Sequence, residues 1–317
     1  MKILANDGID AVAIEILEKA GHTVDTTHIP QDELKEKLQA YDVVTVRSAT
    51  KIRKDLIDAC PNLKVIGRGG VGMDNIDVAY AREKGLSVVN TPAASSISVA
   101  ELVFAHLFNG VRGLHDAQRK MPLEGDTKFG DLKKQYSKGV ELRGKTLGIV
   151  GFGRIGLETA KMALGLGMDV LVYDIIDVPT TVSLTFTGGA KIELQVKQVD
   201  FNELLKSSDF ISLHVPFLGK AMIADEQFAL MKDNVGIVNA CRGGVIDEQS
   251  LLKALDSGKV AFAGLDVFEN EPTPLKEILT HPKISLSPHI GAATAEAQQR
   301  VGEELAELII KSLSTFN

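Results

Sequence analysis

The sequence predicts an α/β protein made of two doubly wound domains, each built on a parallel sheet. Short β-branched runs alternate with helical patterns along most of the chain, which is typical of βαβ units. The alternation is interrupted once, between Val89 and Lys145, so we expect two sheets rather than one. The length of 317 residues fits two domains of roughly 150 residues each.

The first series holds five strand candidates with helical patterns between them. The strand candidates are Ile3–Ala5, Thr23–Thr27, Asp42–Val46, Lys64–Gly67 and Leu86–Val89. The helical patterns are Ile9–Ala20, Gln31–Gln39, Leu56–Cys60 and Asn75–Lys84. Strands separated by helices in this way indicate βαβ units and therefore a parallel sheet.

A long helical pattern, Ser98–Arg119, follows the first series, and a polar stretch from Lys120 to Gly139 comes after it. This stretch holds few apolar residues, so we expect a surface arm rather than part of a core.

The second series resumes the alternation. Its strand candidates are Leu147–Val150, Asp169–Tyr173, Phe210–His214, Val235–Asn239 and Val260–Leu265. Its helical patterns are Ile155–Leu166, Phe201–Lys206, Gln249–Leu255 and Thr294–Leu313. One segment departs from the series: Thr181–Thr187 and Ala190–Val196 alternate around Gly188-Gly189, which predicts an antiparallel hairpin with a primed turn.

The composition excludes several classes of protein. Hydrophobic residues make up 44% of the chain and charged residues 24%, which rules out disorder. The net charge is −7 and no Lys/Arg run is present, so we expect no nucleic-acid partner. No apolar stretch approaches the roughly 20 residues that span a bilayer, and the N-terminus turns polar too early for a signal peptide. The two cysteines, Cys60 and Cys241, indicate a reducing cytoplasm without a disulfide framework or a metal site.

A glycine motif marks a nucleotide site. The segment Gly151-Phe-Gly-Arg-Ile-Gly156 places Gly-x-Gly-x-x-Gly where a strand ends and a helix begins. Gly151 permits the tight turn, Gly153 lets the backbone approach a pyrophosphate, and Gly156 lets helix and strand pack closely. The helix that starts near Arg154 directs its N–H groups at the phosphates. The motif therefore predicts a dinucleotide cofactor.

The type of dinucleotide is indicated by Asp174, which ends the next strand 21 residues beyond Gly153. A carboxylate at this point accepts hydrogen bonds from the adenosine ribose and repels a 2′-phosphate. Ile175 and Ile176 follow it and offer no cation. A strand-end Asp alone is more typical of a solvated side chain, but with the glycines in register it predicts NAD rather than NADP.

Three later segments place polar side chains in apolar surroundings. Arg242 lies just past a strand, Glu271 lies in a loop fixed by a proline, and His289 lies between a proline and a glycine. Each of the three taken singly has a simpler interpretation, as a surface arginine, a loop carboxylate or a hydrogen-bonded loop histidine.

Taken together, these segments resemble the signatures of the D-isomer-specific 2-hydroxyacid dehydrogenase family. The resemblance is carried by the glycine motif and by Gly69–Asp77, Asn90–Pro92, Ser98–Leu102, Asn239–Asp247, Asp266–Pro272 and Pro288–Ala292. These segments follow the family's order over nearly the whole chain. Within the family the sequence is most similar to members that oxidise a phosphorylated 2-hydroxy acid, in a short form without the C-terminal regulatory domain of longer members.

The resemblance implies a role for each matching position. His289 would be the general acid/base, Glu271 would hydrogen-bond its imidazole and favour the charged form, and Arg242 would bind the substrate carboxylate. Cofactor contacts are implied for Gly151, Gly153, Arg154, Ile155, Gly156, Asp174, His214, Val215, Pro216, Ala240, Cys241, Asp266 and Gly291. Substrate contacts are implied for Arg47, Lys51, Val71, Gly72 and Arg242, and no metal is expected.

The resemblance also implies how the domains are connected. The substrate domain would comprise residues 1–95 and 288–317, with a Rossmann-like NAD-binding domain, residues 96–287, inserted between them. Family members are usually homodimers, which here implies an interface through residues 98–139.

Two alternatives remain open. One is a reductase of another 2-keto acid, of the hydroxypyruvate, glyoxylate or D-lactate type, that uses the same three residues. The other is a dinucleotide-sensing binding protein, since a fold alone does not establish an activity. A phosphorylated substrate needs a second anion site, for which the sequence offers Arg47 and Lys51, joined by Lys133 or Lys134 of a second copy.

Overall fold

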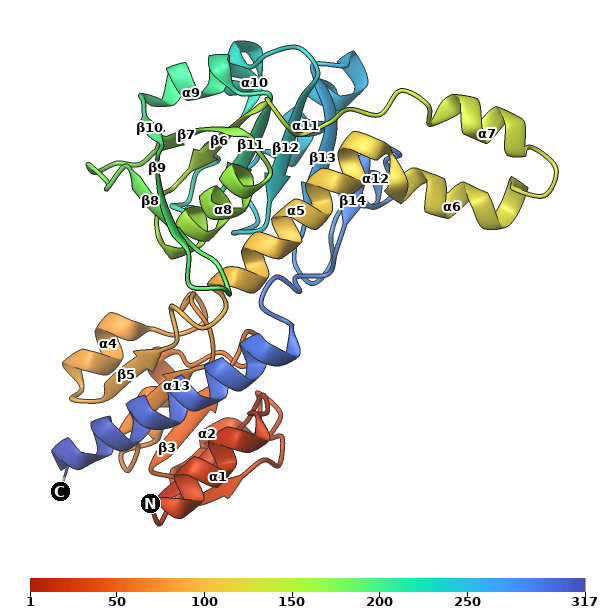
Figure 1. Cartoon of the computed structure of the whole chain (residues 1–317). Helices are drawn as coiled ribbons and strands as arrows, with labels where there is room; N and C mark the ends of the chain where they lie inside the picture. Colours follow the sequence, from red (N-terminus) through yellow and green to blue (C-terminus); the bar gives the residue numbers. More distant parts are fainter. Residues whose placement is uncertain (317) are drawn as a thin grey trace. The chain divides into compact units, whose positions relative to one another are not determined.

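The computed structural model describes residues 1–316, which divide into two compact units. Unit 1 comprises Met1–Ser98 and the chain from Ala292 onward, and unit 2 comprises Val99–Gly291. The divisions fall after Ser98 and Gly291, a few residues beyond the expected boundaries at 95/96 and 287/288, so His289 belongs to unit 2. Each unit has its own parallel sheet with helices on both faces (Figure 1).

The sheet of unit 1 has the strand order β2-β1-β3-β4-β5, and all of its neighbouring strands are parallel. Its strands are β1 (Lys2–Ala5), β2 (Thr23–Asp25), β3 (Val43–Val46), β4 (Val65–Arg68) and β5 (Ser87–Asn90). Its helices are α1 (Ala11–Lys19), α2 (Leu34–Lys37), α3 (Lys54–Ala59), α4 (Val78–Glu83) and α13 (Ala295–Leu313), with 3₁₀ turns at Leu38–Ala40 and Ser314–Phe316.

Alternate strand residues fill the two faces of this sheet, because successive side chains of a strand point to opposite sides. Ile3 and Val43 pack with α1 and α13 on one face, whereas Leu4 and Val44 pack with α2, α3 and α4 on the other. In Figure 1 the blue helix α13 lies along the red helix α1. Gly302 permits this approach, since a Cβ there would lie only 2.9 Å from a side-chain atom of α1's N-cap residue.

The sheet of unit 2 has the order β10-β7-β6-β11-β12-β13-β14, again entirely parallel. Its strands are β6 (Thr146–Val150), β7 (Asp169–Tyr173), β10 (Lys197–Gln198), β11 (Phe210–Leu213), β12 (Val235–Asn239), β13 (Val260–Leu265) and β14 (Ile284–Leu286). The first helices along the chain are α5 (Ser96–Arg112), α6 (Leu114–Glu124), α7 (Phe129–Gln135) and α8 (Arg154–Gly165). The later ones are α9 (Phe201–Ser207), α10 (Asp225–Leu230), α11 (Glu248–Ser257) and α12 (Lys276–Thr280).

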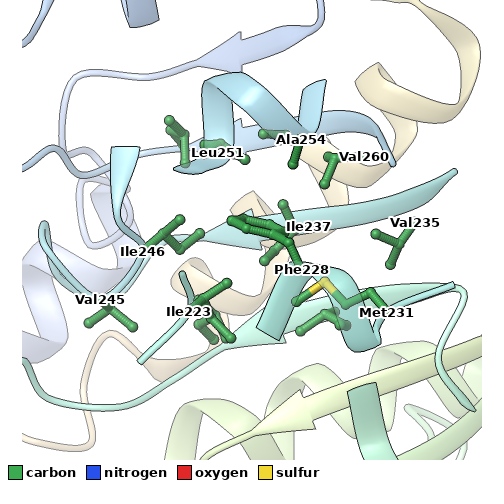
Figure 2. Close-up of a cluster of buried hydrophobic side chains, with 14 of the residues drawn as sticks. Ile223, Phe228, Met231, Val235, Ile237, Val245, Ile246, Leu251, Ala254 and Val260 are labelled. Atoms are coloured by element: carbon green, nitrogen blue, oxygen red, sulfur yellow. The ribbon is translucent and has the colours of Figure 1, made fainter. Parts of the chain in front are cut away.

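Two apolar clusters cover the faces of this sheet. Val103 and Leu107 of α5 and Ala160 of α8 pack on one face. On the other face, Phe228 of α10 and Leu251 of α11 pack against the central strands. Figure 2 shows part of this second cluster, in which side chains of α10 and α11 pack against side chains of the sheet.

The ends of the strands in unit 2 are aligned by their register. One row of paired residues runs through Tyr173, Val150, Leu213, Asn239, Leu265 and Leu286. The residues that come next are Asp174, Gly151, His214, Ala240, Asp266 and Ser287. Because parallel strands have their carboxyl ends at one edge, these loops all leave the sheet at that edge, and the strand order reverses there between β6 and β11.

The expected helix Ser98–Arg119 is in fact two helices. α5 ends at Arg112, and Gly113 has a φ of 59°, a left-handed conformation that breaks the helix before α6 begins. The surface arm is confirmed for α6, which has no buried residue, and for α7, in which only Leu132 is buried. Figure 1 shows both helices, in yellow, projecting away from the sheet of unit 2.

The hairpin is present, but its turn differs from the expected one. β8 (Thr181–Thr185) and β9 (Lys191–Gln195) are antiparallel and form a separate two-stranded sheet. Phe186 donates its N–H to the carbonyl of Ala190, and only Gly189 of the Gly-Gly pair has a positive φ. The loop therefore has three residues ending in a left-handed glycine, because Phe186 and Ala190 close it, and it is not a two-residue primed turn.

Four short elements of unit 2 were not expected from the sequence: α10, α12, β10 and β14. Each has six residues or fewer, which is too short for a hydrophobic period to be recognised. The two helices each bury one side chain, Phe228 in α10 and Ile278 in α12, and the two strands are held by pairing with β7 and β13. In unit 1, the expected helix Gln31–Gln39 is reduced to α2 and the 3₁₀ turn that follows it.

Candidate active site

The glycine motif forms the loop between β6 and α8. Gly151 has a φ of 89°, and a Cβ on it would lie 2.4 Å from the carbonyl oxygen of His214. Gly156 allows α8 to begin against this loop, because a Cβ there would lie 2.3 Å from the Gly151 oxygen. Gly153 has open space at its Cβ position and caps α8, whose next residues Arg154 and Ile155 begin the helix. An open, side-chain-free position before a helix N-terminus fits an approaching phosphate.

Asp174 ties the end of β7 to the glycine loop. Its two carboxylate oxygens accept the N–H groups of Phe152 and Ile175, each at 2.7 Å. Ile175 and Ile176 are exposed, and the chain from residue 175 to residue 190 holds neither Lys nor Arg. A negative group is therefore fixed beside the loop with no cation on the segment that follows it.

His214 ends β11 beside the glycine loop. Its Nε2 is 2.9 Å from the hydroxyl of Ser212, and its Nδ1 is buried without a hydrogen-bond partner among residues 1–316. Burial lowers the pKa of His214 to about 3, so the ring is neutral. Val215 and Pro216 continue the loop and are progressively more exposed. An orphaned buried nitrogen at this edge, together with the open Gly153, fits a bound dinucleotide.

Arg242 lies in a turn organised by Asn239. The Asn239 amide donates to the Arg242 carbonyl at 2.9 Å and accepts from the N–H and the thiol of Cys241. The Arg242 guanidinium contacts the carbonyl of Cys241 at 2.5 Å. Burial raises the pKa of the Cys241 thiol, so this cysteine is not an activated nucleophile. Ala240, half-buried, precedes it at the end of β12.

His289 and Glu271 form a hydrogen-bonded pair. The His289 Nδ1 lies 2.8 Å from the Glu271 Oε2, while the other carboxylate oxygen of Glu271 accepts the Phe268 N–H at 2.9 Å. An ionised carboxylate only accepts, so Nδ1 carries the hydrogen and Nε2 carries the lone pair. Nε2 has no partner among residues 1–316, and the ring is about half exposed. This nitrogen is available to exchange a proton with a ligand.

Asp266 holds the loop that carries His289. Its carboxylate accepts the N–H groups of Ile290 and Gly291, both at 2.8 Å, and its carbonyl accepts the N–H of His289. Asp266 is only 1% exposed, and its carboxylate holds this loop in place. His289 has a φ of 55°, a left-handed conformation that a non-glycine residue keeps only when its surroundings impose it.

Two glutamates connect the Arg242 loop to the Glu271 loop. Glu248 accepts the N–H of Glu269, and Glu269 accepts the N–H of Glu248, each at 2.9 Å. Burial raises the pKa of Glu248, which favours its neutral form beside the second carboxylate. At Gly243 a Cβ would lie 1.8 Å from the Phe268 oxygen, so only glycine permits the two loops to pack together. The residues expected to react thus lie on adjoining loops that are joined by hydrogen bonds.

In unit 1, the loop from Arg47 to Lys51 is fixed by its backbone. Asp7 accepts the N–H groups of Arg47 and Thr50, and Asn75 donates to the carbonyls of the same two residues. Gln31 bonds both the N–H and the carbonyl of Lys51 at 2.8 Å. Neither the Arg47 guanidinium nor the Lys51 ammonium has a hydrogen-bonding partner within residues 1–316. The loop therefore presents two cations without a hydrogen-bonding partner among these residues.

The loop after β4 presents backbone donors. Gly70 donates to the Thr91 hydroxyl at 2.7 Å, and Asn90 donates to the Val71 carbonyl at 2.7 Å. The N–H groups of Val71 and Gly72 have no acceptor among the residues described. Two free, positioned N–H groups can bind an anion.

Neither a metal centre nor a membrane span is found in the part of the chain that the structure covers. Within residues 1–316 no group of three or more His, Cys, Asp or Glu side chains is placed to hold a metal ion. None of the helices described is both long and apolar enough to cross a bilayer.

The sequence did not point to the supporting side chains. His106, Ser285 and Ser287 form a buried polar group behind the His289 loop, and they belong to no recognisable motif. The signal in the sequence was the polarity of His106 inside an apolar helix and of Ser285 inside a short strand, while Ser287 lies just after that strand.

Comparison with known proteins agrees with this geometry. Residues 104–291 match the family description "D-isomer specific 2-hydroxyacid dehydrogenase, NAD binding domain". Hydroxypyruvate reductase of Thermotoga maritima is 46% identical over 98% of this chain and 98% of its own length. D-3-phosphoglycerate dehydrogenase of Methanocaldococcus jannaschii is 45% identical over 99% of this chain, which spans 57% of that longer protein.

A solved structure extends the similarity to the whole fold. The D-lactate dehydrogenase of Aquifex aeolicus, complexed with NAD and lactic acid, has a TM-score of 0.78 and is 29% identical, covering 99% of this chain and 96% of that one. The chain therefore belongs to the D-isomer-specific 2-hydroxyacid dehydrogenase family and is an NAD-dependent oxidoreductase.

Proposed function

We propose that the protein oxidises D-3-phosphoglycerate to 3-phosphohydroxypyruvate, the reaction that opens serine biosynthesis, in a reducing cytoplasm. The proposed phosphate site is supported by the Arg47–Lys51 loop, whose backbone is fixed while its two cations have no hydrogen-bonding partner among residues 1–316. A fixed pair of cations attracts a phosphate even on a chain with a net charge of −7, because a local field does not depend on the total. The relative from M. jannaschii bears the name of this activity.

In this proposal His289 is the general acid/base. The lone pair on Nε2 takes the proton of the substrate hydroxyl, and Nδ1–H stays hydrogen-bonded to Glu271, which stabilises the imidazolium that forms. When bound, NAD supplies the hydride acceptor. Arg242 binds the substrate carboxylate, a task suited to its planar and permanently charged guanidinium. The N–H groups of Val71 and Gly72 serve as further substrate contacts.

A second candidate is the reduction of an unphosphorylated 2-keto acid such as hydroxypyruvate. It is favoured by the relative from T. maritima, which matches this chain over 98% of both lengths. That reaction uses the same Arg242, Glu271 and His289 but has no need for a second anion site. The two candidates therefore differ in what Arg47 and Lys51 do.

We also propose that two copies associate through residues 98–139. Helices α6 and α7 bury a single side chain within their own chain, yet they expose Leu114, Met121, Leu123 and Phe129. Leu123 is 78% exposed, and a second copy of the same arm would cover this apolar surface.

We expect the enzyme to prefer NAD over NADP by at least about tenfold in kcat/KM, equal to about 1.4 kcal/mol. Asp174→Asn should narrow this gap, because it removes the charge that repels a 2′-phosphate but keeps an acceptor for the Phe152 N–H. Steady-state kinetics with both cofactors measures the effect. Equal efficiency with NADP in the wild type would contradict the assignment of Asp174.

His289→Ala should lower kcat by roughly 10²–10⁴, the usual contribution of a positioned acid/base, while NAD still binds. Glu271→Gln should move the acidic limb of the pH–rate profile for oxidation to lower pH, because the imidazolium loses its carboxylate. His281→Ala is the matched control, since His281 also faces a carboxylate in unit 2, at 3.4 Å. An unchanged profile in Glu271→Gln would remove Glu271 from its proposed role.

Arg47→Ala should lower kcat/KM for 3-phosphoglycerate by an amount equal to about 1.5–3 kcal/mol, because one charge-assisted contact to the phosphate is lost. It should change kcat/KM for D-glycerate little, because that substrate has no phosphate. Arg53→Ala is the control, because its guanidinium is paired with Asp77 at 2.9 Å. A panel of phosphorylated and unphosphorylated acids in both directions checks the assignment. If the wild type used 3-phosphoglycerate and D-glycerate equally well, the reductase would be the better assignment.

The wild type should sediment at twice the chain mass of 34.1 kDa. Leu123→Asp combined with Phe129→Asp should shift it toward the single-chain mass, because charges in an apolar interface are desolvated without partners. Phe186→Asp is the control, as Phe186 is equally apolar and is half exposed on the hairpin instead. A double variant that kept the wild-type mass would place the contact elsewhere.

A further inference from the structure

A buried histidine lies behind the loop that carries His289. His106 of α5 is 3% exposed, and its ring is bracketed by two hydroxyl groups. Its Nδ1 lies 2.9 Å from the Ser285 Oγ, and its Nε2 lies 2.9 Å from the Ser287 Oγ. Gly264 makes room for it, because a Cβ there would lie 2.5 Å from the His106 Cβ. The ring is therefore placed by packing and by hydrogen bonds at both nitrogens.

The direction of these hydrogen bonds follows from their chemistry. Ser287 has one hydroxyl hydrogen and donates it to the Asp266 Oδ1 at 2.6 Å, since an ionised carboxylate only accepts. The Ser287 oxygen must then accept from His106, which places the ring hydrogen on Nε2. Burial lowers the pKa of His106 to about 4, so the ring is neutral and its Nδ1 accepts from Ser285.

The chain of hydrogen bonds ends at the backbone around His289. Asp266 uses the same Oδ1 to accept the Ile290 N–H and uses Oδ2 to accept the Gly291 N–H. These bonds hold the segment in which His289 adopts its left-handed φ of 55°. A carboxylate that rotated away would leave two N–H groups without acceptors and would release the constraint on His289.

We infer that His106 is a positioning residue of the reaction, which acts through Ser287 to fix the rotamer of Asp266 and thereby the orientation of His289. The inference rests on the proposed role of His289. His106 touches neither the reacting groups nor Glu271, so it sets the geometry of the acid/base without taking part in the proton transfer.

The test compares His106→Asn with His106→Gln. The longer side chain of glutamine puts its amide where Nε2 lies in histidine, so it keeps a donor to Ser287. The shorter side chain of asparagine puts its amide only where Nδ1 lies. We expect His106→Asn to lower kcat roughly tenfold or more with an unchanged KM for NAD, and His106→Gln to restore most of it. Ser287→Ala should resemble His106→Asn, while Ser285→Ala, which breaks only the bond at Nδ1, should keep most of kcat.

Amide hydrogen exchange at Ile290 and Gly291 supplies a readout that needs no turnover. Exchange should be faster than in the wild type for His106→Asn and Ser287→Ala, and close to the wild type for His106→Gln and Ser285→Ala. The inference would be overturned if Ser287→Ala kept the exchange rate and the kcat of the wild type. It would also be overturned if all four variants lost kcat equally, in line with a fall in their melting temperatures. A wild type without activity on 2-hydroxy acids, or an active His289→Ala, would instead overturn the proposed function.

Discussion

The alignment of the strand ends in unit 2 is the constraint on which its active site depends. The register places Val150, Leu213, Asn239 and Leu265 in one row, so the loops that follow them begin at the same level. A shift of one residue in any of these strands would turn its buried side chains to the opposite face. The apolar cores on both faces of the sheet therefore keep the register, and the register places the glycine loop, the His214 loop, the Arg242 turn and the Asp266 loop along one edge in that order. The packing energy of the core therefore determines where these loops lie.

The loops at this edge are held by hydrogen bonds between loops as well as by bonds within single loops. Asp266 fixes the His289 segment, the glutamates 248 and 269 join two loops, and Asn239 shapes the turn before Arg242. Each such bond adds only about 0.5–1.5 kcal/mol net, but a buried group left without its partner costs about 1–3 kcal/mol. The network therefore favours one arrangement of the loops over alternatives more strongly than it stabilises the fold, and the general acid/base role proposed for His289 requires such a fixed arrangement.

Unit 1 also contains a loop that is held by hydrogen bonds from side chains of other segments. Its Arg47–Lys51 loop is held by Asp7, Gln31 and Asn75, whose side chains bond the backbone of the loop, and Asp7 also accepts from the Thr50 hydroxyl. Within residues 1–316 the cations of that loop have no hydrogen-bonding partner, whereas other lysines and arginines, such as Lys64 and Arg53, are paired with carboxylates. A rigid loop with free charge loses little conformational entropy when it binds an anion.

The sequence by itself determined the fold class, most of the long elements, the NAD motif and the family, because these depend on local pattern and on residue identity. Strands such as Val235–Asn239 and Val260–Leu265 were predicted to the residue, since buried parallel strands are continuous apolar runs. The resemblance also indicated Glu271 and His289 as partners, and the structure places them 2.8 Å apart.

Only the tertiary structure decided the rest. The break at Gly113, the three-residue hairpin loop and the short helices α10 and α12 depend on backbone conformation and on single long-range contacts, which leave no period in the sequence. The hydrogen bonds of Asp266 and His106 were equally hidden, since these partners lie 21 to 181 positions away in the chain. A hydrogen bond between residues so distant is set by the packing of the elements that carry them, and no local pattern of residues encodes it.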